Sequence, residues 1–277
     1  MENTRDIHKN PGLGSYYWGG FRDNSSELIR LKKQASMGIE FEMNFWKSIP
    51  INEDSAILDV GCGPGVISSA IAKFASKGTV VGIDKNSLMI KECKENKEYE
   101  AIKNLSFREG DIYNLDIPEN SVDVIYSRFL FQHLSNPIQA LNQLKKVLKP
   151  GGKVCIIDVD DSWLTLNPRP ALFESYLRRV EDAQKDMGGD RFVGHKLKDY
   201  FEEVGFINVK SKVEMITSCM ININDLLDMI INYKYQLVKS DDMEVAEKER
   251  ASILKLSENE FAWGAVGLFF TTGQKSI

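Results

Sequence analysis

The spacing of apolar residues divides the chain into helix-like and strand-like stretches. Between residues 27 and 48, apolar residues recur at steps of three and four, which predicts an amphipathic helix. From residue 56 onward, short apolar runs alternate with helical stretches. The pattern predicts strands over residues 56–60, 79–83, 105–109, 122–127 and 153–159, and helices over residues 66–75, 87–99 and 137–148. This alternation predicts an α/β fold with a doubly wound parallel sheet.

The second half of the chain is less regular. It predicts helices over residues 196–204, 224–238 and 244–256, and strands over residues 206–213 and 261–272. We interpret residues 1–277 as a single domain with three added segments, residues 1–35, 160–191 and 219–259. These segments have two interpretations: they form a lid over a ligand site, or they cover the edges of the sheet.

Composition narrows the classes of partner. The chain has 277 residues, of which 43% are hydrophobic, and its net charge of -5 is unlike the basic excess of nucleic-acid-binding proteins. No apolar run approaches the roughly 20 residues of a membrane helix. The four cysteines form no C-x-x-C pair and the three histidines lie far apart, which argues against a disulfide framework or a metal site. We therefore expect a cytoplasmic protein without nucleic-acid or membrane partners.

A glycine-rich loop carries the strongest chemical signal. Gly61, Gly63 and Gly65 follow a predicted strand and open a predicted helix, where glycines let a ligand approach the main chain. The spacing is one residue shorter than the G-x-G-x-x-G of dinucleotide sites. Asp59 precedes the loop, and its carboxylate favours an ammonium group over a diphosphate. The loop therefore predicts a site for a cationic ligand.

Two further acids follow predicted strands. Asp84 ends the second strand, where a carboxylate accepts hydrogen bonds from ribose hydroxyls; its alternative role is to cap the next helix. Asp111 follows the third strand and is suited to accept from an adenine amine, while Ile112 offers its backbone N–H to the ring. The alternative for Asp111 is a loop cap. With the glycine loop, these acids predict a nucleoside that carries an amino-acid tail.

Together these segments resemble the successive motifs of class I S-adenosylmethionine-dependent methyltransferases of the small-molecule type. The resemblance spans residues 57–159 and rests on residues 59–65, Asp84, Gly110 and Asp111 with residues 115–118, residues 121–127 and residues 148–152. It implies a Rossmann-like sheet of seven strands, six parallel and an antiparallel seventh, with helical lid elements. It also implies S-adenosylmethionine as the cofactor.

The resemblance assigns roles residue by residue. The glycines would line the methionine part of the cofactor, Asp84 would hold the ribose, and Met89 would pack on the adenine. Tyr17 or its neighbour Tyr16, together with Gln34, would touch the methionyl portion from the helix that closes over the cofactor. The cofactor-binding set implied in this way is Tyr17, Gln34, Asp59, Gly61, Gly63, Gly65, Asp84, Lys85, Met89, Asp111, Ile112, Arg128 and His133.

The reaction and its acceptor are less constrained. His133 is the candidate general base, because an ordinary histidine titrates near neutral pH; the alternative is a histidine that only shapes the pocket. Apolar and aromatic residues in the added segments favour a small metabolite, and we expect O- or N-methylation of a natural-product-like molecule. A nicotinamide-dependent oxidoreductase and a non-methylating S-adenosylmethionine binder are the alternatives. The apolar helix over residues 224–237 leaves both a monomer and a homodimer open.

Overall fold

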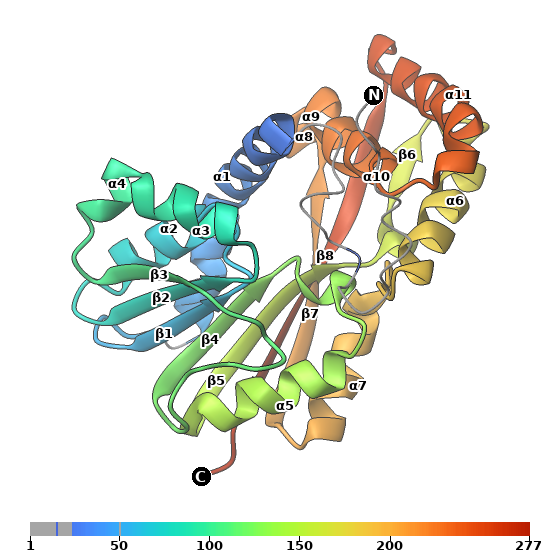
Figure 1. Cartoon of the computed structure of the whole chain (residues 1–277). Helices are drawn as coiled ribbons and strands as arrows, with labels where there is room; N and C mark the ends of the chain where they lie inside the picture. Colours follow the sequence, from blue (N-terminus) through green and yellow to red (C-terminus); the bar gives the residue numbers. More distant parts are fainter. Residues whose placement is uncertain (1–14, 16–23, 50) are drawn as a thin grey trace.

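The computed structural model describes Ser15, residues 24–49 and residues 51–277 (Figure 1). The strands are β1 (Ala56–Val60), β2 (Thr79–Asp84), β3 (Leu105–Glu109), β4 (Val122–Arg128), β5 (Leu148–Val159), β6 (Thr165–Asn167), β7 (Ile207–Thr217) and β8 (Trp263–Gln274). The longer helices are α1 (Asn24–Ser48), α2 (Val66–Phe74), α3 (Ser87–Glu95), α5 (Pro137–Val147), α6 (Phe173–Asp186), α7 (Val193–Val204) and α11 (Met243–Leu254). The shorter helices are α4 (Lys97–Glu100), α8 (Ser218–Ile221), α9 (Ile223–Leu227) and α10 (Tyr233–Tyr235), with a π-helical turn over Asp228–Asn232 between the last two.

The eight strands form one sheet in the order β3-β2-β1-β4-β5-β8-β6, with β7 also paired to β8. The first five strands pair in parallel, and β8 runs antiparallel to β5, β6 and β7. The chain order reverses between the neighbouring strands β1 and β4: β2 and β3 lie on the far side of β1, and β5 lies on the far side of β4. Ligands of open α/β sheets bind outside the carboxyl ends of the strands at such a switch point.

The predicted doubly wound sheet with an antiparallel final strand is confirmed, but the predicted count of seven strands is wrong. The eighth strand is β6, which pairs with the start of β8 through Thr165 and Ala265. It lies inside a segment interpreted from the sequence as a helical addition. Three residues are too few to show the alternating period that identifies a strand.

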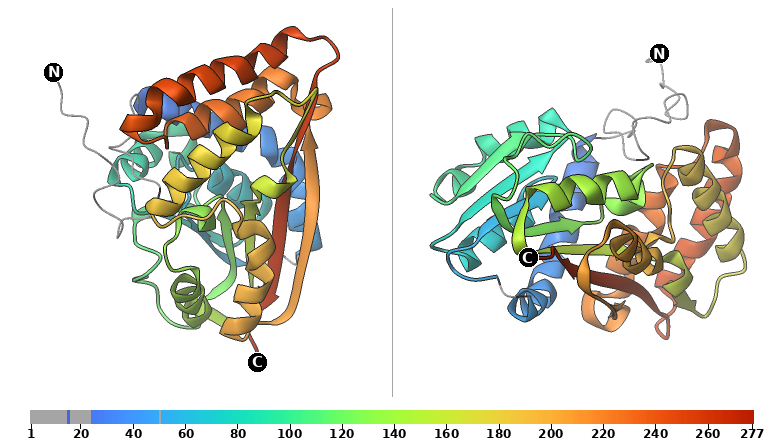
Figure 2. Two further views of the ribbon diagram at one scale, coloured as in Figure 1. Left: turned by 90° about the vertical axis from the view of Figure 1, so that its right-hand side faces the viewer. Right: turned by 90° about the horizontal axis from the view of Figure 1, so that it is seen from below.

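Helices cover both faces of the sheet, as expected for parallel strands that are apolar on both sides (Figure 2). Trp46 of α1 and Ile71 of α2 belong to the apolar core on one face. Leu141 of α5 and Leu197 of α7 belong to the core on the other face. The sheet is thus buried between two helical layers, and its strand ends are free to build a site.

A third apolar core lies at one end of the sheet, where α6, α10 and α11 pack together (Figures 1 and 2). It joins Tyr176 of α6, Ile231 of the π-helical turn and Ile253 of α11. The hydroxyl of Tyr176 donates to the Ile231 carbonyl over 2.6 Å. The two added segments that follow residue 160 therefore pack on each other as one helical unit. Residues 1–14 and 16–23 of the first added segment lie outside the described residues.

Two predicted helices are interrupted. The helix expected over residues 87–99 ends at Glu95, because Asn96 is extended and its side chain accepts from the backbone N–H of Glu98 to begin α4. The helix expected over residues 224–238 contains the π-helical turn after Leu227. Both interruptions have local causes that the spacing of apolar residues along the chain does not predict.

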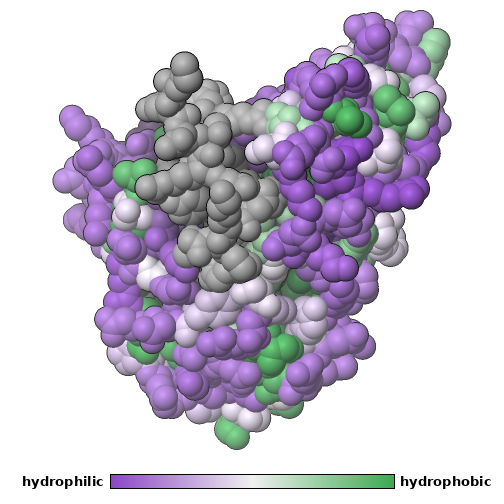
Figure 3. Space-filling view, turned by 45° about the vertical axis from the view of Figure 1, so that its right-hand side comes forward, coloured by the Kyte–Doolittle hydropathy of each residue, from purple (hydrophilic) through white to green (hydrophobic). Residues whose placement is uncertain are grey.

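Within the described residues, no helix is long and apolar enough to cross a membrane. The face seen in Figure 3 is mainly hydrophilic, with apolar residues in small separate groups.

Candidate functional site

The glycine loop joins β1 to α2 and is fixed to β2 by its backbone. The N–H groups of Gly61 and Cys62 donate to the Ile83 carbonyl over 2.8 and 3.0 Å. Gly61, Gly63 and Gly65 all have positive φ angles, of 74°, 50° and 76°. Positive φ angles are unfavourable for residues with a side chain, which explains why these three positions of the loop are glycines.

A cavity of about 580 Å³ opens beside this loop at the carboxyl ends of the first parallel strands. Eleven of the thirteen predicted cofactor-binding residues line it: Gln34, Asp59, Gly61, Gly63, Asp84, Lys85, Met89, Asp111, Ile112, Arg128 and His133. Gly65 does not line the cavity. A Cβ at this position would lie 2.7 Å from Phe107 and 2.9 Å from Cys93 Sγ, so Gly65 permits close packing of the turn. Tyr17 lies outside the described residues.

Asp59 is buried at the base of the cavity, where Ser68 Oγ donates to its Oδ2 over 2.5 Å. Burial raises the pKa of Asp59 to about 7, although the Ser68 hydrogen bond lowers it. A cationic group nearby would favour the ionised carboxylate. Asp59 is therefore suited to sense the charge of a ligand in this cavity.

Asp84 connects the glycine loop to the start of α3. Its Oδ2 accepts from the Gly63 N–H over 2.9 Å and its Oδ1 from the Asn86 N–H over 2.8 Å. The capping residue of α3 is Asn86, whose side chain accepts from Leu88 and Met89. Burial raises the pKa of Asp84, while these hydrogen bonds lower it. Asp84 lines the cavity, and a carboxylate has about four acceptor sites, which suits a pair of hydroxyl donors.

Asp111 and Lys85 form an ion pair of 3.0 Å on the cavity wall. Asp111 Oδ1 also accepts from the Tyr113 N–H over 3.0 Å. The buried Ile112 follows, and Met89 is buried in α3. An acceptor oxygen beside two apolar side chains suits a flat heteroaromatic ring with an amino group.

Arg128 ends β4 and connects it to α1. Its Nε lies 2.5 Å from Glu42 Oε1, and its Nη2 donates to the Gln34 carbonyl over 3.3 Å. The guanidinium also stacks 4.2 Å from the centre of the Phe129 ring. The side chain of Gln34 accepts from Arg30 over 3.3 Å. Arg128 and Gln34 are thus positioned by each other at the wall of the cavity.

His133 is buried, and hydroxyl groups contact both of its ring nitrogens. Nδ1 lies 2.8 Å from Ser15 Oγ, and Nε2 lies 3.2 Å from the Tyr233 hydroxyl. Burial, followed by the charges of Arg191 and Arg30, lowers the pKa of His133 to about 3. The ring is therefore neutral near pH 7 and a weak proton acceptor.

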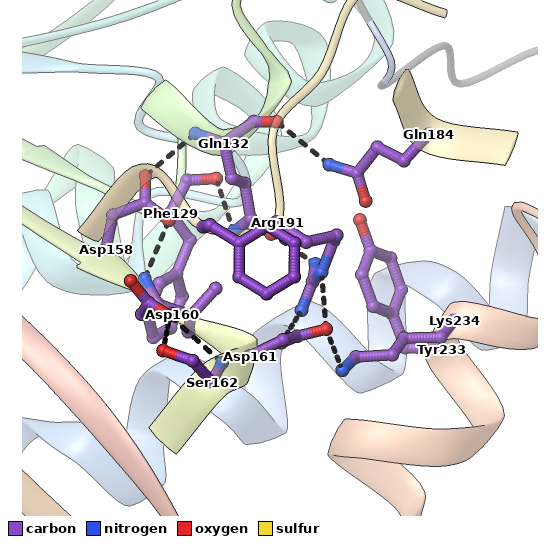
Figure 4. Close-up of polar contacts among 12 residues, drawn as sticks. Phe129, Gln132, Asp158, Asp160, Asp161, Ser162, Gln184, Arg191, Tyr233 and Lys234 are labelled. Atoms are coloured by element: carbon purple, nitrogen blue, oxygen red, sulfur yellow. Dashed lines mark hydrogen bonds and ion pairs between the residues drawn. The ribbon is translucent and has the colours of Figure 1, made fainter. Parts of the chain in front are cut away.

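A second cavity of about 370 Å³ adjoins the first. The two cavities share five lining residues, which are Gln34, Arg128, Phe129, Gln132 and Tyr233. Beyond this shared wall, the second cavity is bounded by apolar side chains, by Glu42 and Asn44, and by a buried charged cluster of Asp161, Arg191 and Lys234 (Figure 4).

The sequence analysis missed this charged cluster. Asp161 follows β5, at the same edge of the sheet as Asp84 and Asp111, and this position was a usable signal. Lys234 stands four residues after Ile230 in an otherwise apolar stripe, which also marks a buried charge. Arg191 carries no comparable signal, because it lies in a loop before α7.

Comparison with known proteins gives consistent matches. A sequence model described as a methyltransferase domain matches residues 51–205. An uncharacterized methyltransferase of Schizosaccharomyces pombe is 39% identical over 116 residues, which cover 40% of this chain and 42% of that protein. The match thus spans less than half the length of that relative. A demethylmenaquinone methyltransferase of Lactobacillus johnsonii is 27% identical over 203 residues, which cover 68% of this chain and 80% of that protein.

Solved structures agree on the fold. Phosphoethanolamine N-methyltransferase 2 of Haemonchus contortus, in complex with phosphomonomethylethanolamine and S-adenosylhomocysteine, matches with a TM-score of 0.54 at 20% identity. The match covers 83% of this chain and 51% of that one.

Proposed function

Because this chain belongs to the class I S-adenosylmethionine-dependent methyltransferases, we propose that its larger cavity binds S-adenosylmethionine and that it methylates a small organic acceptor in the smaller cavity. The observation that carries the proposal is the shared wall of the two cavities. A donor site and an acceptor site must meet for direct transfer, and Phe129 and Tyr233 lie where they meet.

The residues of the larger cavity fit this cofactor. Asp84 has acceptor oxygens for a ribose, and Asp111 with Ile112 suits an adenine edge. Gly63 has no atom within 4 Å of where a Cβ would lie, so a ligand has room against the main chain there. The buried Asp59 favours a cationic amino-acid tail over a diphosphate. The nicotinamide-dependent alternative therefore has no support from the charge of this loop.

When bound, S-adenosylmethionine supplies an electrophilic methyl carbon on a sulfonium. The chain's own part is to align the acceptor and exclude water, which lowers the entropic cost of an in-line displacement. Gln34 and Arg128 brace α1 against β4 at the shared wall. Tyr233 presents its ring there and fixes the ring of His133.

We assign His133 a positioning role rather than that of a general base. Its lowered pKa leaves it a poor proton acceptor at neutral pH. Nitrogen or acidic oxygen nucleophiles, which need no strong base, therefore suit this site best. The name of the demethylmenaquinone methyltransferase relative is consistent with a small-molecule acceptor.

Isotope transfer tests the proposal. The chain is incubated with S-adenosylmethionine that carries a deuterated methyl group and with a small-molecule extract, and products are identified by mass spectrometry. We expect a labelled product with the wild type and with Asp116→Ala, an exposed acid outside the cavity lining. Asp84→Ala should reduce the rate at least about tenfold, the size expected for losing one well-placed hydrogen-bonding group. Cofactor binding without labelled product from any extract would instead support a non-methylating binder.

A further inference from the structure

Two buried cations share one carboxylate at the wall of the smaller cavity (Figure 4). Arg191 donates to both oxygens of Asp161, through Nη2 over 2.8 Å and Nε over 3.0 Å. Lys234 Nζ donates to Oδ2 of the same carboxylate over 2.6 Å. The exposed fractions of Arg191 and Lys234 are 5% and 1%. A buried charge is costly unless it is paired, and within these ion pairs the two cations exceed the one carboxylate by one positive charge.

Among the described residues, the other nearby acids form no ion pair with Arg191 or Lys234, although the charges of Asp158 and Glu181 act to raise the pKa of Arg191 and of Lys234, respectively. Glu42 is paired with Arg128, and Glu27 with Arg30. Asp158 accepts from the backbone N–H groups of Gln132 and Val159 and does not line the cavity. Glu181 has no hydrogen bond to either cation in the part of the chain that the structure describes.

Both cations keep unused donors. An ammonium has three N–H donors and a guanidinium has five. Among the described residues, Lys234 donates only to Asp161, whereas Arg191 adds a contact from Nη1 to Gln132 Oε1 over 2.5 Å. The charges of Arg191 and Lys234 lower the pKa of Asp161 although its burial would raise it. Asp161 is therefore ionised, and the remaining donors are available to a second anion.

Elsewhere the cavity is lined by the Glu42–Arg128 ion pair, by the polar residues Gln34, Asn44 and Gln132, and by a group of apolar side chains. The apolar group consists of Ile216, Met220, Met229, Ile230 and Leu268, so the cavity combines a positive cluster with an apolar surface. Arg191 and Lys234 line the smaller cavity but not the larger one. An anion held by them is consequently in the smaller cavity and not in the one that we assign to the cofactor.

Building on the proposed function, we propose that the methyl acceptor is an organic acid, whose carboxylate binds to Lys234 and Arg191 and whose apolar body fills the smaller cavity. One negative charge neutralises the one surplus positive charge. The carboxylate is an anchor, and the methylated atom is another atom of the molecule that faces the shared wall.

Paired carboxylate and amide probes test this proposal. Benzoate, cinnamate and octanoate are titrated into the full chain, with and without saturating S-adenosylhomocysteine, and each is compared with its uncharged amide. We expect at least one carboxylate to bind about tenfold or more tightly than its amide. If no carboxylate is preferred in either condition, the proposal is wrong.

Variants locate the effect. Lys234→Met leaves Asp161 and Arg191 as a balanced pair, so we expect it to fold, to bind S-adenosylhomocysteine like the wild type, and to lose the carboxylate preference. Lys239→Met is the matched control, because this lysine pairs at the surface with Asp186. If Lys234→Met does not fold, Lys234→Gln keeps a donor to Asp161 without the charge. An unchanged carboxylate preference in the folded Lys234 variant would overturn the assignment.

The two proposals fail separately. If the wild type does not bind S-adenosylhomocysteine but binds carboxylates more tightly than their amides, the proposed function is wrong and the anion site stands. A wild type that binds S-adenosylhomocysteine but shows no carboxylate preference refutes the anion site alone.

Discussion

At the residue scale, burial decides what His133 can do. A histidine at this position of the sequence is a natural candidate for a base, because its ordinary pKa lies near neutrality. In the structure it is closed in by Ser15, Gln184 and Tyr233. Its pKa of about 3 removes the advantage that made it a candidate.

This environment predicts a pH-dependent stability. The folded pKa of His133 lies below its unfolded value of about 6.5, so the unfolded chain binds more protons between pH 6.5 and 3. The free energy of unfolding should therefore decrease as the pH is lowered through that range, by up to about 1.4 kcal/mol per pH unit from this residue. His133→Gln should lose less stability between pH 7.5 and pH 5 than the wild type, as measured by urea unfolding.

The comparison with the variant is needed because Asp59 and Asp158 act in the opposite direction. Burial raises the pKa of each to about 7, so in the folded protein they hold protons that they would release when unfolded. Both proteins contain them, and their contribution cancels. Equal losses in wild type and variant would show that His133 is not buried neutral.

The sequence located the acids of the larger cavity because each ends or follows a parallel strand. Asp84 and Asp111 lie at the carboxyl ends of β2 and β3, and those ends meet at one edge. Asp161 follows β5, Arg191 lies in the loop before α7 and Lys234 lies in α10, so these three meet only in the folded chain. Their separation in sequence hides a cluster that burial and charge make evident in three dimensions.

At the element scale, the turn between β1 and α2 shows why similar glycines have different roles. Gly63 and Gly65 both have positive φ angles. Gly63 faces open space, whereas Gly65 faces Phe107 and Cys93. The sequence identified the turn, but the direction of each missing Cβ depends on the strands and helix around it.

These surroundings predict different costs for two alanine substitutions. Gly65→Ala should lower the free energy of unfolding by about 2–4 kcal/mol, from the left-handed backbone and from overpacking. Gly63→Ala should lower it by only about 1–2 kcal/mol, since only the backbone cost applies. Gly63 lines the cavity, so Gly63→Ala should also weaken the binding of S-adenosylhomocysteine, by more than its small loss of stability would explain. Chemical denaturation and calorimetric titration measure the two effects, and equal destabilisation would contradict this account.

The spacing of apolar residues predicted most strands and their covering helices to within a few residues, because these buried elements are long and regular. It failed where a local hydrogen bond or a short pairing decides the structure. Asn96 breaks one helix through its own side chain, and β6 exists because β8 is long enough to pair with it beside β5.

At the scale of the whole molecule, one sheet positions two cavities. The strand ends and the glycine loop build the larger, and α8, the π-helical turn and α10 contribute to the wall of the smaller. Gln34 of α1 lines both cavities, so this helix forms part of the wall of each. A ligand in the larger cavity should therefore stabilise the fold as a whole.

Thermal unfolding with two nucleoside ligands tests the central claim most directly. At about one hundred times its Kd, a ligand specific for the folded chain adds about 2.7 kcal/mol, which raises Tm by about 5–10 °C for a domain of this size. We predict this rise with S-adenosylhomocysteine and none with NAD. A rise with NAD and none with S-adenosylhomocysteine would contradict the account.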